Sequence, residues 1–243
     1  MNDVTLLFAE SVVARFFDHD SLSSLNDLSS GLFVSAGRLL WENRLAIYLN
    51  VVYNSTAKTF DYCLRCVRSN EKRDYGRSNG NGDYGLEEPY TYDPADHRFV
   101  RYLRVRLLKD KSSLNSLEVT WTSATPSDPT LLKFLRVPFA RNSLYTDTNC
   151  LEALKLLPSY CTFNSIYASE VYNEVLDAII ERSQECGRLE NVKCEEFFTK
   201  RGRKESIEWI LTNKRLQFIS YSDIKDHEDL DSIGAALTAI GVQ

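Results

Sequence analysis

The C-terminal half of the sequence repeats one pattern of apolar residues, and this repeat constrains the fold more than any other feature. Apolar residues spaced x, x+3, x+5 recur four times, at successive offsets of 29, 26 and 27 residues. We expect each triplet to mark a strand that a helix follows. The four triplets are Phe134/Val137/Phe139, Phe163/Ile166/Ala168, Leu189/Val192/Cys194 and Leu216/Ile219/Tyr221.

Stretches that favour helices follow the triplets, at 150–157, 169–182 and 204–213, and a final helix at 229–240 would close the array. A strand and a returning helix every 26–29 residues is the period of leucine-rich-repeat-like solenoids. One unit cannot bury both faces of its strand and helix alone, so neighbours stack and the strands form a parallel sheet. No unit carries the full leucine-rich consensus or its asparagine or cysteine ladder. The sequence therefore predicts degenerate βα repeats, with an ordinary α/β protein as the alternative.

The middle of the chain begins with a predicted β-hairpin. Residues 46–53 and 60–67 are rich in β-branched and aromatic side chains, and the polar turn Asn54-Ser55-Thr56 separates them. We therefore expect two antiparallel strands that this turn connects.

A second hairpin is predicted from 99–108 and 117–121. In its first arm Arg104 and Arg106 alternate with apolar residues, which indicates a strand with one face in water. The segment between the hairpins, 69–97, contains four glycines and is predicted to be a long mobile surface loop.

Residues 3–44 have helical periodicity and predict three short amphipathic helices. The fold class that follows is α+β: a short N-terminal helical segment, antiparallel strands, and C-terminal βα units with a parallel sheet. The corresponding parts are 1–44, 45–125 and 130–243.

Composition limits the kind of partner. Hydrophobic residues make up 43% of the chain, as in a folded globular protein, and the net charge of −5 argues against a nucleic-acid partner. The N-terminus has no basic segment leading into an apolar run, and no apolar stretch is long enough to span a bilayer. We therefore expect no membrane partner, a cytoplasmic or nuclear location, and buried free thiols for the six cysteines.

The chemical motifs predict neither a cofactor nor a metal site. Residues 80–85 match G-x-G-x-x-G, but no apolar strand precedes them and Pro89 disfavours the helix that must follow. Cys63 and Cys66 lie three apart on a predicted strand, so their side chains point to opposite faces. The basic run 200–204 is interpreted as a solvated turn, with a phosphate or acidic-peptide contact as the alternative.

The histidines and carboxylate pairs are interpreted as exposed and solvated. His19, His97 and His227 each lie beside acidic residues in predicted loops, and no nucleophile-elbow motif is present. We therefore expect no catalytic residues.

The N-terminal segment resembles an F-box, a motif of about forty residues in three helices. Leu7-Phe8-Ala9-Glu10 stands at its opening, and the run Ser21-Leu22-Ser23-Ser24-Leu25-Asn26-Asp27-Leu28-Ser29 is similar to its middle. Phe33 stands near the aromatic position and Trp41 near the end, whereas the usual opening proline is absent. With its β-rich middle and degenerate repeats, the plan is similar to the F-box-related proteins expanded in nematodes.

This resemblance implies an intracellular protein-binding protein that acts as a substrate adaptor of a cullin-type ubiquitin ligase. The N-terminal helices would bind a Skp-type adaptor, and the remainder would present a surface to a substrate. The anchors for the adaptor would be Phe8, Val12, Leu22, Leu25 and Phe33.

Three alternatives stay open. The same N-terminal helices would, in one alternative, only cap the chain's own sheet. A recognition or structural protein without any ligase role would use the 69–97 loop and the repeat surface. An enzyme on an α/β scaffold would hold two or more titratable groups within hydrogen-bonding reach in a deep pocket.

Overall fold

A computed structural model of the chain describes most of its residues. These are Ala9 and the ranges 31–68, 88–91, 93–114, 119–136, 141–147, 151–169, 173–194, 201–213, 215–220 and 227–241, with Phe197.

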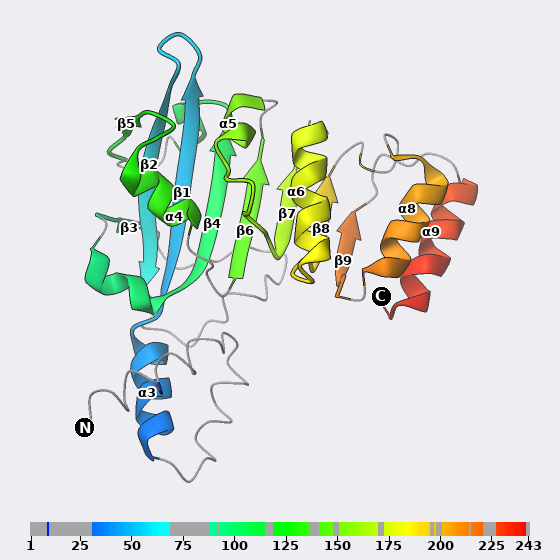
Figure 1. Cartoon of the computed structure of the whole chain (residues 1–243), viewed down its shortest axis with the longest axis horizontal. Helices are drawn as coiled ribbons and strands as arrows, with labels where there is room; N and C mark the ends of the chain where they lie inside the picture. The colour runs from blue at the N-terminus through cyan, green and yellow to red at the C-terminus, as the bar shows by residue number, and fades with distance from the viewer. Residues whose placement is uncertain are drawn as a thin grey trace. The chain divides into compact units, whose positions relative to one another are not determined.

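The described strands form one mixed sheet of nine strands (Figure 1). Their order is β3-β2-β1-β4-β6-β7-β8-β9, and β5 pairs with β2 beside this path. β2 is antiparallel to β3 and β5, whereas β6, β7, β8 and β9 are parallel to one another. The strands are β1 (Leu45–Asn54), β2 (Thr59–Arg68), β3 (Glu88–Pro89), β4 (Val100–Leu108), β5 (Thr122–Ala124), β6 (Arg141–Thr146), β7 (Ser165–Ala168), β8 (Asn191–Cys194) and β9 (Phe218–Ser220).

Helices alternate with the parallel strands along the chain. In Figure 1, α4, α5 and α6 lie on the viewer's side of the sheet. The predicted class, with antiparallel strands first and βα units with parallel strands after them, is confirmed. The helices are α3 (Gly31–Glu42), α4 (Pro129–Arg136), α5 (Leu151–Lys155), α6 (Glu174–Glu185), α8 (Arg203–Thr212), α9 (His227–Ala239) and the 3₁₀ helices η2 (Pro94–Phe99) and η3 (Lys111–Leu114).

The chain divides into two compact units. The first contains 1–49, 64–104 and 138–141, and the second contains 50–63, 105–137 and 142–243. The boundaries predicted at 1–44, 45–125 and 130–243 stay a prediction.

The first predicted hairpin is confirmed as β1 and β2, which are neighbours in the sheet. Its turn is fixed locally, because the side-chain oxygen of Asn54 accepts hydrogen bonds from the amides of Thr56 (3.1 Å) and Ala57 (3.0 Å). Lys58 closes the turn in the left-handed region, at a φ of 52°. Asparagine favours such turns because its side chain replaces a backbone acceptor.

The second predicted hairpin is wrong in its return arm. β4 lies where the first arm was expected, but the next described strand is β5, and it pairs with β2 through Phe60, Asp61 and Tyr62. The loop expected over 69–97 also needs correction at its C-terminal end, where β3 joins the sheet and η2 begins at Pro94. Residues 69–87 lie outside the described residues.

The parallel strands share one buried row of side chains, which we call the core row. It consists of Leu144, Ile166, Val192 and Ile219, paired in register across β6, β7, β8 and β9. The first three side chains are fully buried and Ile219 is 6% exposed. The last two members of the second and third triplets lie on β7 and β8 as predicted, and Ile219 of the fourth lies on β9. The first members of these triplets, Phe163, Leu189 and Leu216, precede the strands, and Tyr221 is outside the described residues.

The first triplet was placed wrongly. Phe134 lies in α4, not in a strand, and the strand of this unit is β6, which begins at Arg141. The helix begins here because Asp128 accepts hydrogen bonds from the amides of Thr130 and Leu131, each at 2.9 Å, and Pro129 takes the first helical position. The apolar residues of this segment therefore follow a helical period.

A polar ladder runs beside the core row at the start of the strands. The Asn142 amide donates to Oδ1 of Asn164 (3.0 Å), and the Asn164 amide donates to the carbonyl of Asn142 (2.8 Å). The ladder continues from the carbonyl of Asn164 to the amide of Glu190 (2.8 Å), and from the carbonyl of Glu190 to the amide of Gln217 (2.6 Å). These bonds satisfy buried backbone groups where the strands begin, which fixes the register of neighbouring units.

Helix α6 has clear sequence signals at both its start and its end. Asn173 caps its start by accepting hydrogen bonds from the amides of Val175 and Leu176, each at 3.0 Å. Gly187 follows its end with a φ of 62°, a conformation that glycine adopts without strain. The buried hydroxyl of Ser183 accepts a hydrogen bond from the amide of Phe163 at 3.0 Å, which joins this helix to the segment before β7.

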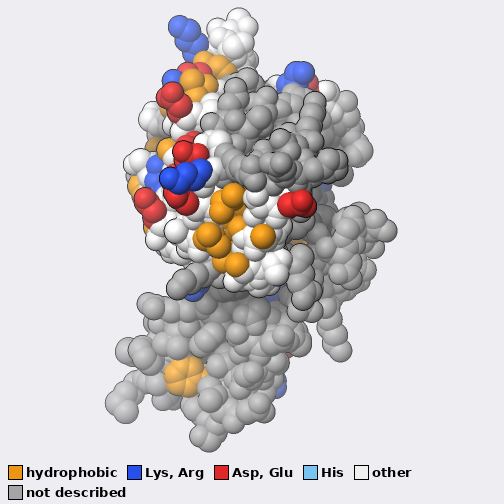
Figure 2. Space-filling view, turned by 90° about the vertical axis from the view of Figure 1, so that its right-hand side faces the viewer, with side chains coloured by type: hydrophobic (Ala, Val, Ile, Leu, Met, Phe, Trp, Pro, Cys, Tyr) orange, Lys and Arg blue, Asp and Glu red, His pale blue; other side chains and the backbone are white. Residues whose placement is uncertain are grey.

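The last two helices, α8 and α9, pack against each other after β8 and β9. Trp209, Ile210, Ile233 and Leu237 are buried among them. Figure 2 looks onto this side of the molecule and shows a group of hydrophobic side chains with Lys, Arg, Asp and Glu side chains close by. Leu211 of α8 remains 44% exposed.

Truncation of the core row should destabilise the protein strongly. We expect Ile166→Ala to lower the free energy of unfolding by about 2–5 kcal/mol, because it removes buried methyl groups and leaves a cavity. The measurement is denaturant-induced unfolding. The matched control is Leu211→Ala at an exposed position, where we expect a change within about 0.5 kcal/mol. An Ile166→Ala variant as stable as this control would show that the core row does not stabilise the protein through burial.

Candidate functional site

A pocket of about 350 Å³ lies where β4, β6 and β7 end, beside β8, and all of its lining belongs to the second unit. This edge is where parallel α/β sheets usually hold their ligands, because the segments that follow the strands diverge there. The lining residues are Arg106, Leu107, Leu108, Tyr145, Thr146, Asp147, Tyr167, Ala168, Ser169 and Lys193.

Three of these side chains form a second row across the sheet, which we call the pocket row. Tyr145 pairs in register with Tyr167, and Tyr167 pairs with Lys193. Each residue of the pocket row comes directly after a member of the core row in the sequence, so the pleat of the strand turns its side chain to the opposite face of the sheet. The two tyrosine rings stack with their centroids 4.4 Å apart and their planes 16° apart.

Arg106 extends this arrangement onto β4. Its neighbours Val105 and Leu107 are buried, at 1% and 0% exposure, so the alternation of the strand places Arg106 on the other face. Arg106 is partly exposed and Lys193 is exposed. The stacked tyrosines thus lie on two strands between the strands that carry the two cations.

Hydrogen bonds tie together the strand ends that form the pocket wall. The side chain of Asp147 accepts from the amide of Lys109 at 3.0 Å, and its own amide donates to the carbonyl of Leu107 at 3.3 Å. The amide of Ser169 donates to the carbonyl of Thr146 at 3.1 Å. The wall is therefore preorganised, and one carboxylate oxygen of Asp147 already has a partner.

The chemistry of the lining favours binding of an acceptor-rich group. A guanidinium, an ammonium and the hydroxyls of two tyrosines and Ser169 supply donors, against the single carboxylate of Asp147. Within the described part of the chain, no three His, Cys, Asp or Glu side chains gather in a way that would hold a metal ion.

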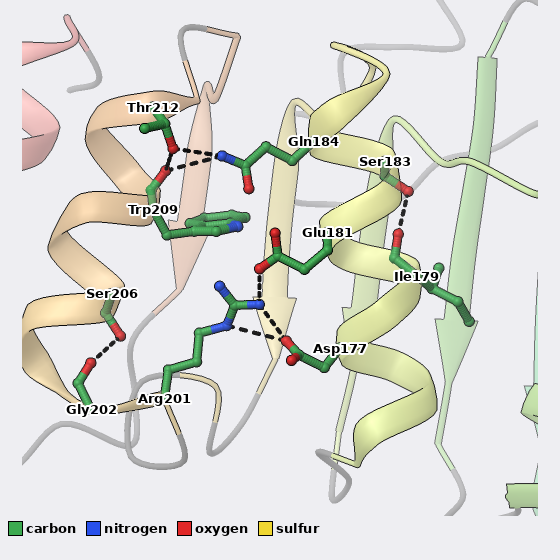
Figure 3. A network of polar contacts seen from close by, with 10 residues as sticks. All are labelled: Asp177, Ile179, Glu181, Ser183, Gln184, Arg201, Gly202, Ser206, Trp209 and Thr212. Carbon is green, nitrogen blue, oxygen red and sulfur yellow. Dashed lines mark hydrogen bonds and ion pairs between the residues drawn. The ribbon is translucent and has the colours of Figure 1, made fainter.

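A second polar cluster joins α6 to the segment before α8 (Figure 3). The guanidinium of Arg201 forms ion pairs with Asp177 and Glu181, and its Nε donates to Asp177 at 3.2 Å. The same group lies 4.6 Å from the ring centre of Phe197 and 5.6 Å from that of Trp209. The side chain of Arg201 is only 12% exposed.

This cluster corrects the interpretation of the basic run 200–204 at one position. Arg201 is not solvated but held between two carboxylates and two aromatic rings. Gln184 supports the same junction, since its Nε2 donates to the hydroxyl of Thr212 at 2.7 Å. Lys204, by contrast, is 83% exposed and lies 3.9 Å from Glu208.

The wet strand face predicted around Arg104 also needs correction. Arg104 is 5% exposed, and its guanidinium lies 5.0 Å from the ring centre of Tyr48 and 5.5 Å from that of Tyr102. The hydroxyl of Tyr102 accepts two hydrogen bonds from it, each at 3.1 Å. Tyr102 on the same strand and Tyr48 on the neighbouring β1 therefore bury this arginine, whereas Arg106 lines the pocket.

The residues predicted to bind an adaptor are mostly beyond what the structure describes. Phe33 is in α3, partly buried against a cluster of Ala9, Ala36 and Leu40 that Phe99 also contacts. The other four predicted anchors, Phe8, Val12, Leu22 and Leu25, lie outside the described residues, as do 80–85 and His19.

The described cysteines carry no disulfide. Cys63 and Cys66 lie in β2 as predicted and are buried, whereas Cys186 after α6 is exposed. The thiol of Cys161 donates to the carbonyl of Leu135 at 2.9 Å. Burial raises the pKa of Cys161 to about 11, so this group stays protonated and unreactive near neutral pH.

Comparison of the chain with protein families, with curated proteins and with solved structures gives no match. In the described residues, no helix combines the length and the apolar character needed to cross a membrane.

Removal of the Arg201 guanidinium should loosen the junction between α6 and α8. We expect Arg201→Ala to lower the free energy of unfolding by about 1–3 kcal/mol, because two carboxylates lose a partner that is mostly shielded from water. The effect should shrink at high salt, since Asp177 and Glu181 are partly exposed.

The matched control for this variant is Lys204→Ala, which removes one exposed positive charge from the same segment and should change stability by less than about 0.5 kcal/mol. Thermal and denaturant unfolding measure both. Equal stabilities of the two variants would show that Arg201 does not hold the junction.

Proposed function

We propose that this chain is a protein-binding protein, and that the pocket at the ends of β4, β6, β7 and β8 receives a segment of the partner. The observation that carries the proposal is the pocket row: side chains from neighbouring strands stand in register on a rigid buried sheet. Sheets built from stacked βα units bind partners through such surfaces, because the repeat aligns equivalent side chains.

The residue types of the pocket support a protein partner. Tyrosine and arginine are enriched among the residues that dominate binding at protein interfaces, because each combines a large contact area with hydrogen-bonding groups. Tyr145, Tyr167 and Arg106 are all partly exposed, so they are accessible without rearrangement of the core.

Within this proposal, the F-box-like N-terminus binds a Skp-type adaptor of a cullin ubiquitin ligase and the sheet binds the substrate. The resemblance at residues 7–41 supports this role. Phe33 packs against Ala9, Ala36 and Leu40 of the same N-terminal segment, so this contact does not distinguish the adaptor role from the alternative in which the N-terminal helices serve only as a cap.

An enzyme remains the second candidate, because the pocket lies at the strand ends where α/β enzymes bind substrates. Asp147, Ser169 and Lys193 would supply its ionisable and hydroxyl groups. Such an enzyme would take a small molecule into the pocket instead of a protein segment.

Photo-crosslinking from the pocket distinguishes these two functions. We expect the chain with p-benzoylphenylalanine in place of Tyr167 to form covalent adducts with a protein in cells, and these adducts should decrease when Lys193→Ala is added. The control places the same group at Tyr160, which is 54% exposed and does not line the pocket. Equal adducts from both positions, or none from position 167, would reject the protein-binding pocket.

The adaptor role is tested by titration of the purified chain with a purified Skp-type adaptor. We expect saturable binding that Leu22→Asp abolishes while the protein keeps its unfolding transition, because an exposed anchor tolerates a charge. If no binding occurs and Leu22→Asp unfolds the protein, the N-terminal helices are a cap and the adaptor role is rejected.

A further inference from the structure

We propose that the pocket recognises an acidic peptide segment with two carboxylate side chains, one bound by Arg106 and the other by Lys193. This inference rests on the proposed protein-binding function and names the chemistry of the partner. Three observations support it: the charge of the lining, the separation of the strands that carry the two cations, and the position of the stacked tyrosines.

The charge of the lining selects an anion. Arg106 and Lys193 bring two positive charges to the lining, and Asp147 brings one negative charge. The remaining polar groups of the wall include hydroxyls, which donate to carboxylate oxygens. The whole chain carries a net charge of −5, so this local excess of positive charge differs from the rest of the sequence.

The separation of the strands that carry the two cations favours two anionic groups over one. β6 and β7 separate β4 from β8, so three interstrand steps lie between the backbones that carry Arg106 and Lys193. At roughly 4.8 Å for each step, this distance is about 14 Å. A single phosphate would have to draw both cations to one point above the tyrosines, whereas two carboxylates leave each cation above its own strand.

An extended peptide that crosses the strands matches this distance. Its residues rise roughly 3.3 Å each, so side chains at positions i and i+4 lie about 13 Å apart. Positions separated by an even number also point to the same face, so both carboxylates would face the sheet.

The stacked tyrosines lie below the middle of such a peptide. Tyr145 and Tyr167 occupy the two strands between the cations, and their rings stack at 4.4 Å. The side chain at position i+2 would contact this aromatic surface, so an apolar or aromatic residue fits there. The recognised pattern is therefore acidic, any residue, apolar, any residue, acidic.

The test measures binding of fluorescent peptides by anisotropy. The series contains glutamates at i and i+2, at i and i+4, and at i and i+6, with glutamine in place of each glutamate as neutral controls, and a peptide with a single phosphoserine. We expect the i, i+4 peptide to bind most tightly and to lose about fivefold in affinity for each glutamate replaced, as for a partly exposed ion pair.

Variants of the protein assign each carboxylate to a cation. Lys193→Gln should weaken the two-glutamate peptide about fivefold, and it should not weaken the peptide whose glutamate on the β8 side is already glutamine. The matched control is Lys204→Gln, which removes an exposed charge from α8, away from the pocket, and should leave binding unchanged.

Three results would overturn the inference. They are an affinity that does not depend on the spacing of the two glutamates, an equal loss of affinity in Lys193→Gln and Lys204→Gln, or tighter binding of the phosphoserine peptide. Photo-crosslinking separates this failure from failure of the proposed function. Adducts from position 167 without binding of the acidic peptides would reject the acidic segment and retain the protein partner. Absence of both the adducts and the peptide binding would reject the acidic segment and the protein partner together.

Discussion

The register of the four parallel strands is the constraint on which the second unit depends. It aligns the core row, three of whose members are fully buried. Because side chains alternate along a strand, the same register determines which residues stand on the opposite face. The register that buries the core row therefore also aligns the pocket row.

The polar ladder supports this register at the start of the strands. Asn142 and Asn164 bond to each other through both backbone and side chain, and Glu190 continues the series through its backbone. Buried polar groups without partners are costly, so a displaced strand would lose these bonds as well as apolar contacts. Apolar burial and hydrogen bonding thus favour the same alignment, which makes the wall of the pocket rigid.

Local signals in the sequence were sufficient for most elements of the C-terminal half. The last three apolar triplets identified β7, β8 and β9 because their members at x+3 and x+5 follow the alternation of a strand, whereas the member at x precedes the strand. The first triplet failed because Asp128 and Pro129 begin a helix, and Phe134 belongs to its buried side. The return arm of the second hairpin was expected at 117–121, whereas the next described strand, β5, pairs with β2, because strand pairing is a long-range choice that neighbouring residues do not specify.

The pocket could not be predicted, because its residues come together only through the register. Tyr145 and Tyr167 are 22 positions apart, and no motif connects them with Lys193 or Arg106. Alternation alone would have placed each tyrosine opposite its apolar neighbour, but not beside the other tyrosine. Arg104 and Arg106 show the same limit, since both have the pattern of a wet strand face, and Arg104 is buried where Tyr48 from β1 and Tyr102 from its own strand cover it.

The unequal spacing of the core row has a consequence for how this architecture tolerates insertions. Its members are separated by 22, 26 and 27 residues, yet they align without offset. A residue added between a strand and its helix lengthens only a connecting loop. A residue added inside a strand would exchange the two faces beyond that point, turning a side chain of the pocket row toward the buried face and a side chain of the core row toward the solvent. Length can therefore vary freely in the connections, whereas each strand has to keep its phase.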